Sequence, residues 1–210
     1  MADFHQNGVI STLHNLSNRS LDEIEQELRE YSKDAPIELI LPSLYSELEG
    51  AALKNIVSCL RDIKYLNHIT IGLDKANKSE FIKAKKFFSD LNQSHSVLWN
   101  DSPKMKQLDS DFEKLGIAPN QPGKGKNVWY CMGYTYSRNE AGSVALHDCD
   151  ITTYNRELLA RLVYPVSNPH FNYEFCKGYY PRIREGALSG RVTRLLVTPL
   201  LKTFKKVLGH

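Results

Sequence analysis

Eight residues organise this chain: Ser143-Val144-Ala145-Leu146-His147-Asp148-Cys149-Asp150. The apolar run from Val144 to Leu146 predicts a short buried strand. Asp148 and Asp150 follow it, and on an extended strand end residues two apart point the same way. Two such carboxylates make an all-oxygen pocket suited to Mg²⁺ or Mn²⁺, which can bridge a protein and a diphosphate. A solvated strand end often carries the same pattern, so the motif alone leaves both interpretations open.

The composition indicates one globular domain with a real core, since 41% of the 210 residues are hydrophobic and 24% are charged. A net charge of +3 is too small to indicate a nucleic-acid partner. No apolar run approaches the ~20 residues that span a bilayer, so no membrane partner is expected. The N-terminus lacks the pattern of a signal peptide, and the four cysteines have no regular spacing. These features favour a reducing, cytoplasmic location.

Apolar periodicity predicts alternating helices and strands after a polar N-terminal arm, residues 1–18. Ser20 and Glu23 form a capping box that predicts a helix start. The expected helices cover residues 20–33, 48–63, 77–91, 104–115, 131–138 and 154–162, and the expected strands cover 37–41, 68–73, 96–99 and 144–146. Strand character is also expected within 171–184, followed by a helix from about 190 that Pro199 kinks or divides. This order predicts an α/β fold, a mainly parallel sheet with helices on both faces.

Ligands of such sheets bind beyond the carboxyl ends of the strands. Polar groups follow three of the expected strands, at Pro42–Glu47, at Asp74 and at Asp148–Asp150. We therefore expect these strand ends to converge on one crevice.

Several of these groups have two interpretations. Glu47 and Glu49 are candidates for binding ribose hydroxyls or for first-turn acids that the helix dipole favours. Asp74 is a candidate for contacting a base or for capping the next helix. His147 alternates away from the aspartates, which favours packing or hydrogen bonding elsewhere.

Two glycine-containing stretches are similarly open. Gly123-Lys124-Gly125 lets the backbone approach a nucleotide while Lys124 faces a phosphate or a uracil carbonyl, or it is a surface turn between two helices. Gly190-Arg191-Val192-Thr193 at a helix start is a candidate cradle for a phosphate or carboxylate, or an ordinary helix cap with a solvated arginine.

Taken together, these stretches resemble retaining nucleotide-sugar glycosyltransferases of the glucosyl-3-phosphoglycerate synthase family. The resemblance rests on four motifs in the same order along the chain: Leu41-Pro42-Ser43-Leu44, Gly123-Lys124-Gly125 with Trp129, Asp148-Cys149-Asp150, and Gly190-Arg191-Val192-Thr193. It implies a GT-A, Rossmann-like nucleotide-sugar-binding domain over residues 19–210. It also implies transfer of glucose from UDP-glucose to 3-phosphoglycerate with retention, a Mg²⁺ or Mn²⁺ cofactor, and a homodimer.

The resemblance also implies roles for individual residues. The donor would be bound by Pro42, Ser43, Leu44, Glu47, Asp74, Lys124 and Asp148. Asp150 would ligate the metal, and the acceptor's phosphate would be bound by Gly190, Arg191 and Thr193. The family usually has an Asn-Glu pair after Pro-Ala-Leu, where this chain has Tyr45-Ser46-Glu47.

Family members continue well past the position that matches His210, and that part supplies a metal-binding histidine and further acceptor contacts. We therefore expect weak or absent transfer by the 210-residue chain. Mannosyl-3-phosphoglycerate synthase and glucosylglycerate synthase are the enzymatic alternatives, and a non-catalytic nucleotide-sugar-binding protein is the alternative from another class.

Overall fold

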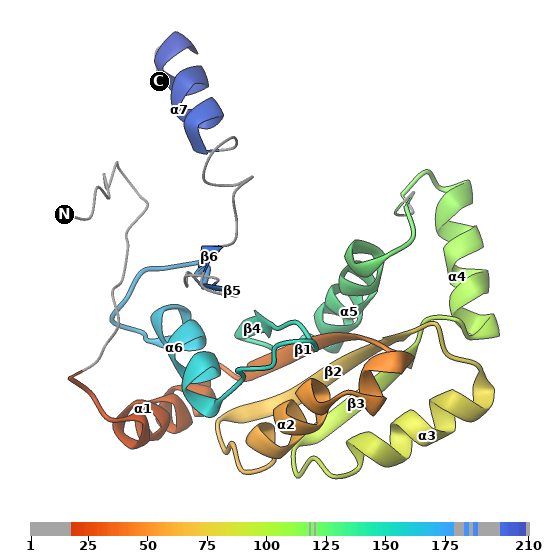
Figure 1. Ribbon diagram of the computed structural model, residues 1–210, viewed down its shortest axis with the longest axis horizontal. Coiled ribbons are helices and arrows are strands. Elements are labelled where there is room, and N and C mark those ends of the chain that lie inside the picture. The colour runs from red at the N-terminus through yellow and green to blue at the C-terminus, as the bar shows by residue number, and fades with distance from the viewer. Residues whose placement is uncertain are drawn as a thin grey trace. The chain divides into compact units, whose positions relative to one another are not determined.

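A computed structural model describes residues 18–117, 119, 121–178, 183–184, 187–188 and 198–208. The chain forms two compact units, Met1–Cys176 and Lys177–His210 (Figure 1). In the second unit, β5 (Ile183–Arg184) pairs antiparallel with β6 (Ala187–Leu188), and α7 covers Thr198–Leu208. Pro199 stands in the first turn of α7, a position that suits proline. Residues 1–17 lie outside the described part, so the expected arm and the domain over 19–210 stay predictions.

The first unit is built on a four-stranded parallel sheet with the strand order β3-β2-β1-β4. Its strands are β1 (Ile37–Leu44), β2 (Leu66–Asp74), β3 (Ser94–Trp99) and β4 (Ser143–Leu146). The chain adds β2 and β3 on one side of β1 and then returns to place β4 on the other side. The direction of strand addition therefore reverses between β1 and β4, and ligands of open α/β sheets bind at such a reversal.

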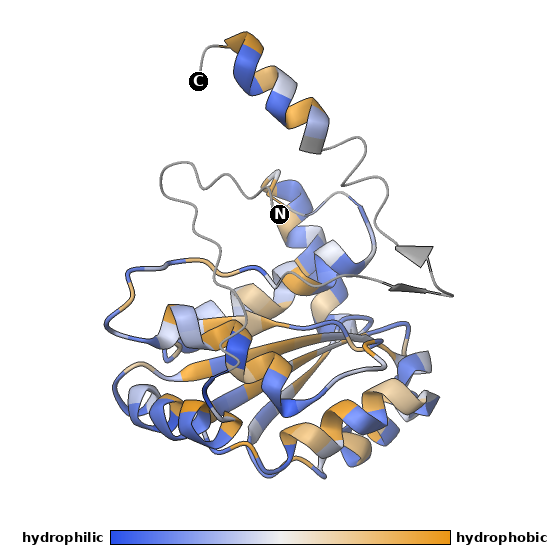
Figure 2. Cartoon of the chain, turned by 60° about the vertical axis from the view of Figure 1, so that its left-hand side comes forward, coloured by the Kyte–Doolittle hydropathy of each residue, from blue (hydrophilic) through white to orange (hydrophobic). Residues whose placement is uncertain are grey.

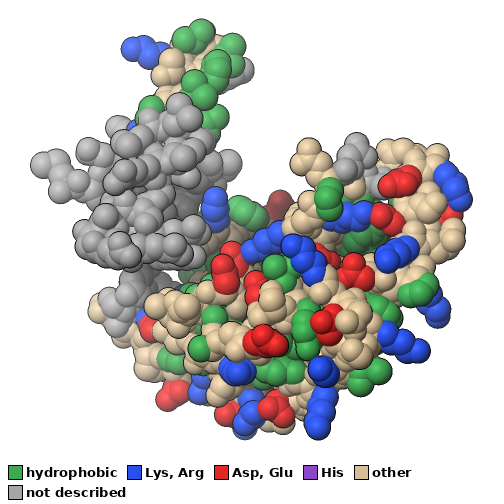
Figure 3. Space-filling view, turned by 45° about the vertical axis from the view of Figure 1, so that its right-hand side comes forward, with side chains coloured by type: hydrophobic (Ala, Val, Ile, Leu, Met, Phe, Trp, Pro, Cys, Tyr) green, Lys and Arg blue, Asp and Glu red, His purple; other side chains and the backbone are tan. Residues whose placement is uncertain are grey.

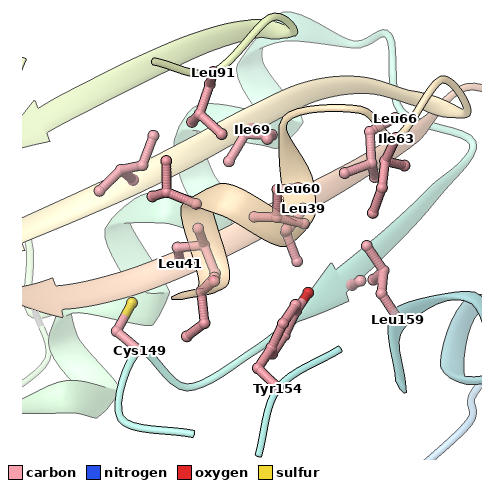
Figure 4. Close-up of a cluster of buried hydrophobic side chains, with 14 of the residues drawn as sticks. Leu39, Leu41, Leu60, Ile63, Leu66, Ile69, Leu91, Cys149, Tyr154 and Leu159 are labelled. Carbon is pink, nitrogen blue, oxygen red and sulfur yellow. The ribbon is translucent and has the colours of Figure 1, made fainter. Parts of the chain in front are cut away.

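Helices cover both faces of this sheet, as the alternating pattern predicts (Figure 1). Side chains of α1 (Leu21–Asp34), α2 (Ala51–Leu60), α3 (Lys78–Phe88) and α6 (Arg156–Ser167) join one apolar core with Leu39, Leu41, Ile69 and Ile71. Figure 4 shows part of this core, where side chains of β1, β2 and α2 meet Tyr154 and Leu159. Hydrophobic residues are concentrated along the strands in Figure 2.

The opposite face of the sheet packs against α5 (Lys124–Arg138), which contacts β1 and β2. Alternation along the strands turns Glu38, His68 and Gly72 towards this helix. Glu38 is buried opposite Arg138 of α5, with 3.5 Å between the nearest charged atoms. This layer is therefore much more polar than the core on the other face.

Two further elements lead towards the carboxyl edge of the sheet. The short 3₁₀ helix η1 (Tyr45–Glu49) follows β1 directly, and α4 (Pro103–Lys114) lies between β3 and α5. None of the residues of α4 is buried. The two helix starts at Ser20 and Asn77 are capping boxes, with Glu23 and Glu80 as the reciprocal partners.

Four expectations about local structure were wrong. The helix expected after Tyr130 begins at Lys124, and the helix expected from residue 48 begins at Ala51, because η1 contains Leu48. Residues 171–178 form no strand. Leu146 is 39% exposed; β4 is an edge strand, which within the described residues pairs with β1 alone.

All four cysteines are free thiols. Within the described residues, no helix combines the length and apolar character needed to cross a membrane.

Candidate functional site

A cleft of about 540 Å³ lies at the carboxyl edge of the sheet, bounded by β1, β2, α4, α5 and the segment after β4. Seven residues that the sequence singled out line it: Pro42, Ser43, Leu44, Glu47, Asp74, Lys124 and Asp150. In the coloured part of Figure 3, basic and acidic side chains are intermixed rather than segregated by sign. The three strand ends therefore converge on one crevice, beside the reversal between β1 and β4.

The carboxylate of Glu47, in η1, holds the end of β1. Glu47 Oε2 accepts hydrogen bonds from the backbone N–H of Leu44 at 2.8 Å and from Ser43 Oγ at 3.1 Å. Ser43 is buried and Glu49 is exposed outside the cleft. Glu47 thus fixes the shape of this wall, and it is the glutamate of the pair that faces the cleft.

Asp74, the last residue of β2, lines the cleft. Asn100 Nδ2 donates a hydrogen bond to its Oδ1 at 2.7 Å. Burial raises the pKa of the Asp74 carboxyl, while the side-chain amides of Asn100 and Asn127 oppose that rise. Asn77 caps the following helix, so Asp74 has no capping role there.

Gly123 is the N-cap of α5 and has a φ of 132°, a conformation that residues other than glycine rarely adopt. The Gly-Lys-Gly stretch is therefore a helix start at the cleft and not a turn between two helices. Lys124 in this first turn forms an ion pair with Asp148. About half of each side chain is exposed, so the pair contributes at most about 1 kcal/mol to stability and is easily opened.

The prediction that Asp148 and Asp150 point the same way was wrong, because the chain leaves β4 at Leu146 and turns at residues 149–150 instead of continuing as an extended strand. Asp150 is exposed and lines the cleft, whereas Asp148 faces Lys124 and does not line the cleft. Cys149 between them is buried, and burial raises the pKa of its thiol. His147 points away and bonds through Nδ1 to the Tyr154 hydroxyl at 3.1 Å, as its alternation with the aspartates predicts.

Comparison with known proteins shows which proteins the chain is similar to. No family model matches it. Over 209 residues it is 49% identical to a glucosyl-3-phosphoglycerate synthase of Persephonella marina, covering 100% of this chain and 52% of that protein. A glucosyl-3-phosphoglycerate synthase of Methanococcoides burtonii is 36% identical over 206 residues, 97% of this chain and 50% of the relative. The chain is homologous to the glucosyl-3-phosphoglycerate synthases. It spans about half the length of these curated relatives.

Solved structures support the fold of this synthase homologue. The glucosyl-3-phosphoglycerate synthase of Mycobacterium tuberculosis in complex with Mn²⁺, UDP and glucosyl-3-phosphoglycerate matches with a TM-score of 0.52 and 19% identity, over 88% of this chain and 56% of that chain. Its complex with UDP gives a TM-score of 0.51 and 18% identity, over 98% and 58%. At this level of identity, the comparison supports the fold.

The synthase homologue also has cleft residues that the sequence analysis missed. Asp109 of α4 pairs with Lys126 and accepts a 2.5 Å hydrogen bond from the Tyr130 hydroxyl, and all three residues line the cleft. Two hydrogen bonds lower the pKa of the Asp109 carboxyl: the larger effect comes from Lys126 and the smaller one from Tyr130. These contacts hold α4 against α5.

Carboxylates near the cleft are the candidate ligands for a divalent cation. Asp150 faces the cleft, and Asp148 is engaged in the exposed ion pair with Lys124. Among the described residues, no group of three His, Cys, Asp or Glu side chains could hold a metal ion. One or two carboxylates together with substrate phosphates are nevertheless a common Mg²⁺ site, so the residues present fit a metal that arrives with a diphosphate.

The three residues expected at the acceptor, Gly190, Arg191 and Thr193, lie outside the described residues. Their role stays a prediction.

Proposed function

We propose that the chain binds UDP-glucose in this cleft and is the donor-binding part of a retaining glycosyltransferase that forms glucosyl-3-phosphoglycerate from 3-phosphoglycerate. The names of the two curated relatives support the reaction, and one of the solved neighbours is a complex with Mn²⁺, UDP and glucosyl-3-phosphoglycerate. One observation carries the proposal for this chain. The cleft lies at the reversal of strand order and is lined by seven of the expected donor and metal residues.

In this proposal, the wall formed by Pro42, Ser43, Leu44 and Glu47 binds the uridine and ribose of the donor. The geometry supports this role because hydrogen bonds to Glu47 already hold Ser43 and Leu44 in one conformation. Asp74 accepts a hydrogen bond from the base. Lys124 holds the donor from the other side. Its position in the first turn of α5, beside Asp148, favours a contact with a phosphate.

The proposed metal ligand is Asp150, with Asp148 in support. A bound Mg²⁺ or Mn²⁺ would supply positive charge to the departing diphosphate. The ion pair between Lys124 and Asp148 opens at little cost, which would free a cation for phosphate and a carboxylate for the metal. Gly190, Arg191 and Thr193 are proposed to hold the acceptor's phosphate, so that its hydroxyl reaches the sugar on the face that the diphosphate leaves. Positioning and charge stabilisation would supply most of the catalysis.

The test incubates the chain with UDP-glucose, Mn²⁺ and 3-phosphoglycerate and measures both donor binding and sugar transfer, with Asp150→Asn as the matched control. We expect donor binding that Asp150→Asn weakens. Donor binding that is equally strong in Asp150→Asn would remove Asp150 from the proposed metal site. Failure of the folded chain to bind UDP-glucose would overturn the proposal itself.

We also propose that the protein is a cytoplasmic homodimer. Four free thiols support a reducing location, and sedimentation of the purified chain tests the dimer. A sedimenting mass near the 24.0 kDa of one chain would contradict it.

A further inference from the structure

Two side-chain amides from different elements bond to the end of β2 at Asp74. Asn100 Nδ2 donates to Asp74 Oδ1 at 2.7 Å. Asn127 donates through Nδ2 to the backbone carbonyl of Gly72 at 2.9 Å, two residues before Asp74, and its amide also favours the ionised carboxylate. Both asparagines line the cleft.

The fold fixes both amides. Asn100 is the first residue after β3, and its backbone N–H donates to the carbonyl of Leu73 at 3.1 Å, which continues the parallel ladder past the strand. Asn127 is 3% exposed in the first turns of α5, pressed against β2 where Gly72 has no side chain. The sheet end thus fixes the backbone of Asn100, and the contact with β2 fixes the side chain of Asn127.

The two polar atoms of the Asn100 side-chain amide differ in their hydrogen bonding. Its Oδ1 is buried without a hydrogen-bond partner in the described part of the chain, which is an unfavourable state for an amide oxygen. A flipped amide would turn this oxygen towards the Asp74 carboxylate and lose the 2.7 Å bond. The bond to Asp74 therefore favours the observed orientation of the Asn100 amide.

We propose that Asn100 and Asn127 are positioning residues that orient the Asp74 carboxylate to accept a hydrogen bond from a ring N–H of the nucleotide base. This rests on the proposed function of the cleft. A carboxylate that already accepts from amides keeps free lone pairs for one more donor. Uracil presents a ring N–H on its pairing edge, whereas cytosine presents a ring nitrogen acceptor there. The proposal therefore includes a preference for UDP over CDP.

The groups that surround Asp74 are consistent with this role. Asp101, whose charge disfavours ionisation of Asp74, is occupied by a hydrogen bond from the backbone N–H of Ala76 at 3.0 Å. Lys75 favours the ionised form, and it follows Asp74 in a left-handed conformation with a φ of 54°. The groups near Asp74 are thus the two amides, the Asp101 carboxylate, the Lys75 ammonium group and the Cys131 thiol.

The first measurement is an NMR titration of the Asp74 carboxyl carbon in the ligand-free chain, in the unaltered protein, Asn100→Ala and Asn127→Ala. We expect its pKa to rise in both variants, because each loses a donor to the ionised form. Asn92→Ala is the matched control, since Asn92 donates to the carbonyl of Arg61, away from the cleft. It should leave the Asp74 pKa unchanged. A pKa that moves in neither test variant overturns the positioning role.

The second measurement is the affinity for UDP and CDP as a function of pH. Asn100→Ala should bind UDP about tenfold more weakly at pH 7, and its loss of binding on acidification should begin at a higher pH. In the Asp74→Asn background, the further Asn100→Ala change should have no effect. A uniform loss of affinity at every pH, or an equal loss in both backgrounds, would show a merely structural asparagine.

The two proposals can fail separately. If the unaltered chain binds neither UDP nor CDP, the proposed function fails and the base contact fails with it. If it binds UDP normally while the Asp74 pKa is indifferent to Asn100 and Asn127, only the positioning role fails. Equal affinity for UDP and CDP overturns the base contact alone.

Discussion

Replacing Gly72 by alanine should destabilise the fold and loosen the cleft together. A methyl group at Gly72 would overlap Oδ1 of Asn127, and it would lie 2.8 Å from Cγ of Asn127 and 2.5 Å from Sγ of Cys131. All of these atoms are buried, and overpacking a core typically costs about 1–3 kcal/mol. If Asn127 yields, the buried carbonyl of Gly72 also loses its hydrogen bond, at about 1–3 kcal/mol more. We expect a loss of roughly 2–6 kcal/mol in the free energy of unfolding.

Urea unfolding followed by circular dichroism measures this loss, and Gly133→Ala is the matched control. A methyl group at Gly133, on the exposed side of α5, meets no atom within 4 Å. The same chemical change there should stabilise the protein by up to about 1 kcal/mol, because alanine favours a helix interior over glycine. Combining Gly72→Ala with Asn127→Ala should cost less than the sum of the two. The argument is refuted if Gly72→Ala is as stable as the unaltered chain.

Three further predictions concern stability, pH and binding. Glu47→Ala should lower the free energy of unfolding, measured in urea, by about 1 kcal/mol, as the loss of a helix cap does. It should also weaken UDP binding in calorimetry, and an unchanged affinity would exclude a role in donor binding for the wall that Glu47 holds. Lys124→Ala should leave the melting temperature nearly unchanged, because the pair with Asp148 is exposed, yet bind UDP about tenfold more weakly; a large fall in melting temperature would contradict the weak pair. Burial lowers the pKa of His68 to about 4. As the pH falls, His68 is therefore protonated in the unfolded state before it is protonated in the folded state. The free energy of unfolding should therefore fall from about pH 6.5 to pH 4, by up to about 1.4 kcal/mol per pH unit, and His68→Gln should flatten that slope.

The architecture could be predicted because the apolar segments alternate regularly and the polar residues after them stand at strand ends. Parallel strands bring those ends to one edge, so Pro42, Asp74 and Asp150 had to lie near each other once the sheet was correct. The helix starts at Ser20 and Asn77 were equally local, since each capping box is complete within four residues.

Other features depend on tertiary contacts that the sequence pattern does not contain. The start of α5 was missed because its first residues, Lys124 to Asn127, are polar or glycine and show no apolar period. Asn100, Asn127 and Asp109 are ordinary polar residues in sequence, and they enter the cleft only through packing of α4, α5 and β3. A signal for Asn127 did exist, because a glycine inside a strand, here Gly72, indicates close approach by another element.

The central claim is that the cleft binds a nucleotide sugar together with a divalent cation held by Asp150. Calorimetric titration of UDP-glucose into the chain, with and without Mg²⁺, tests it most directly when repeated on Asp150→Ala. The account predicts binding that requires the metal and is lost in the variant. Binding that is indifferent to both metal and variant, or no binding by a chain that circular dichroism shows to be folded, would contradict it.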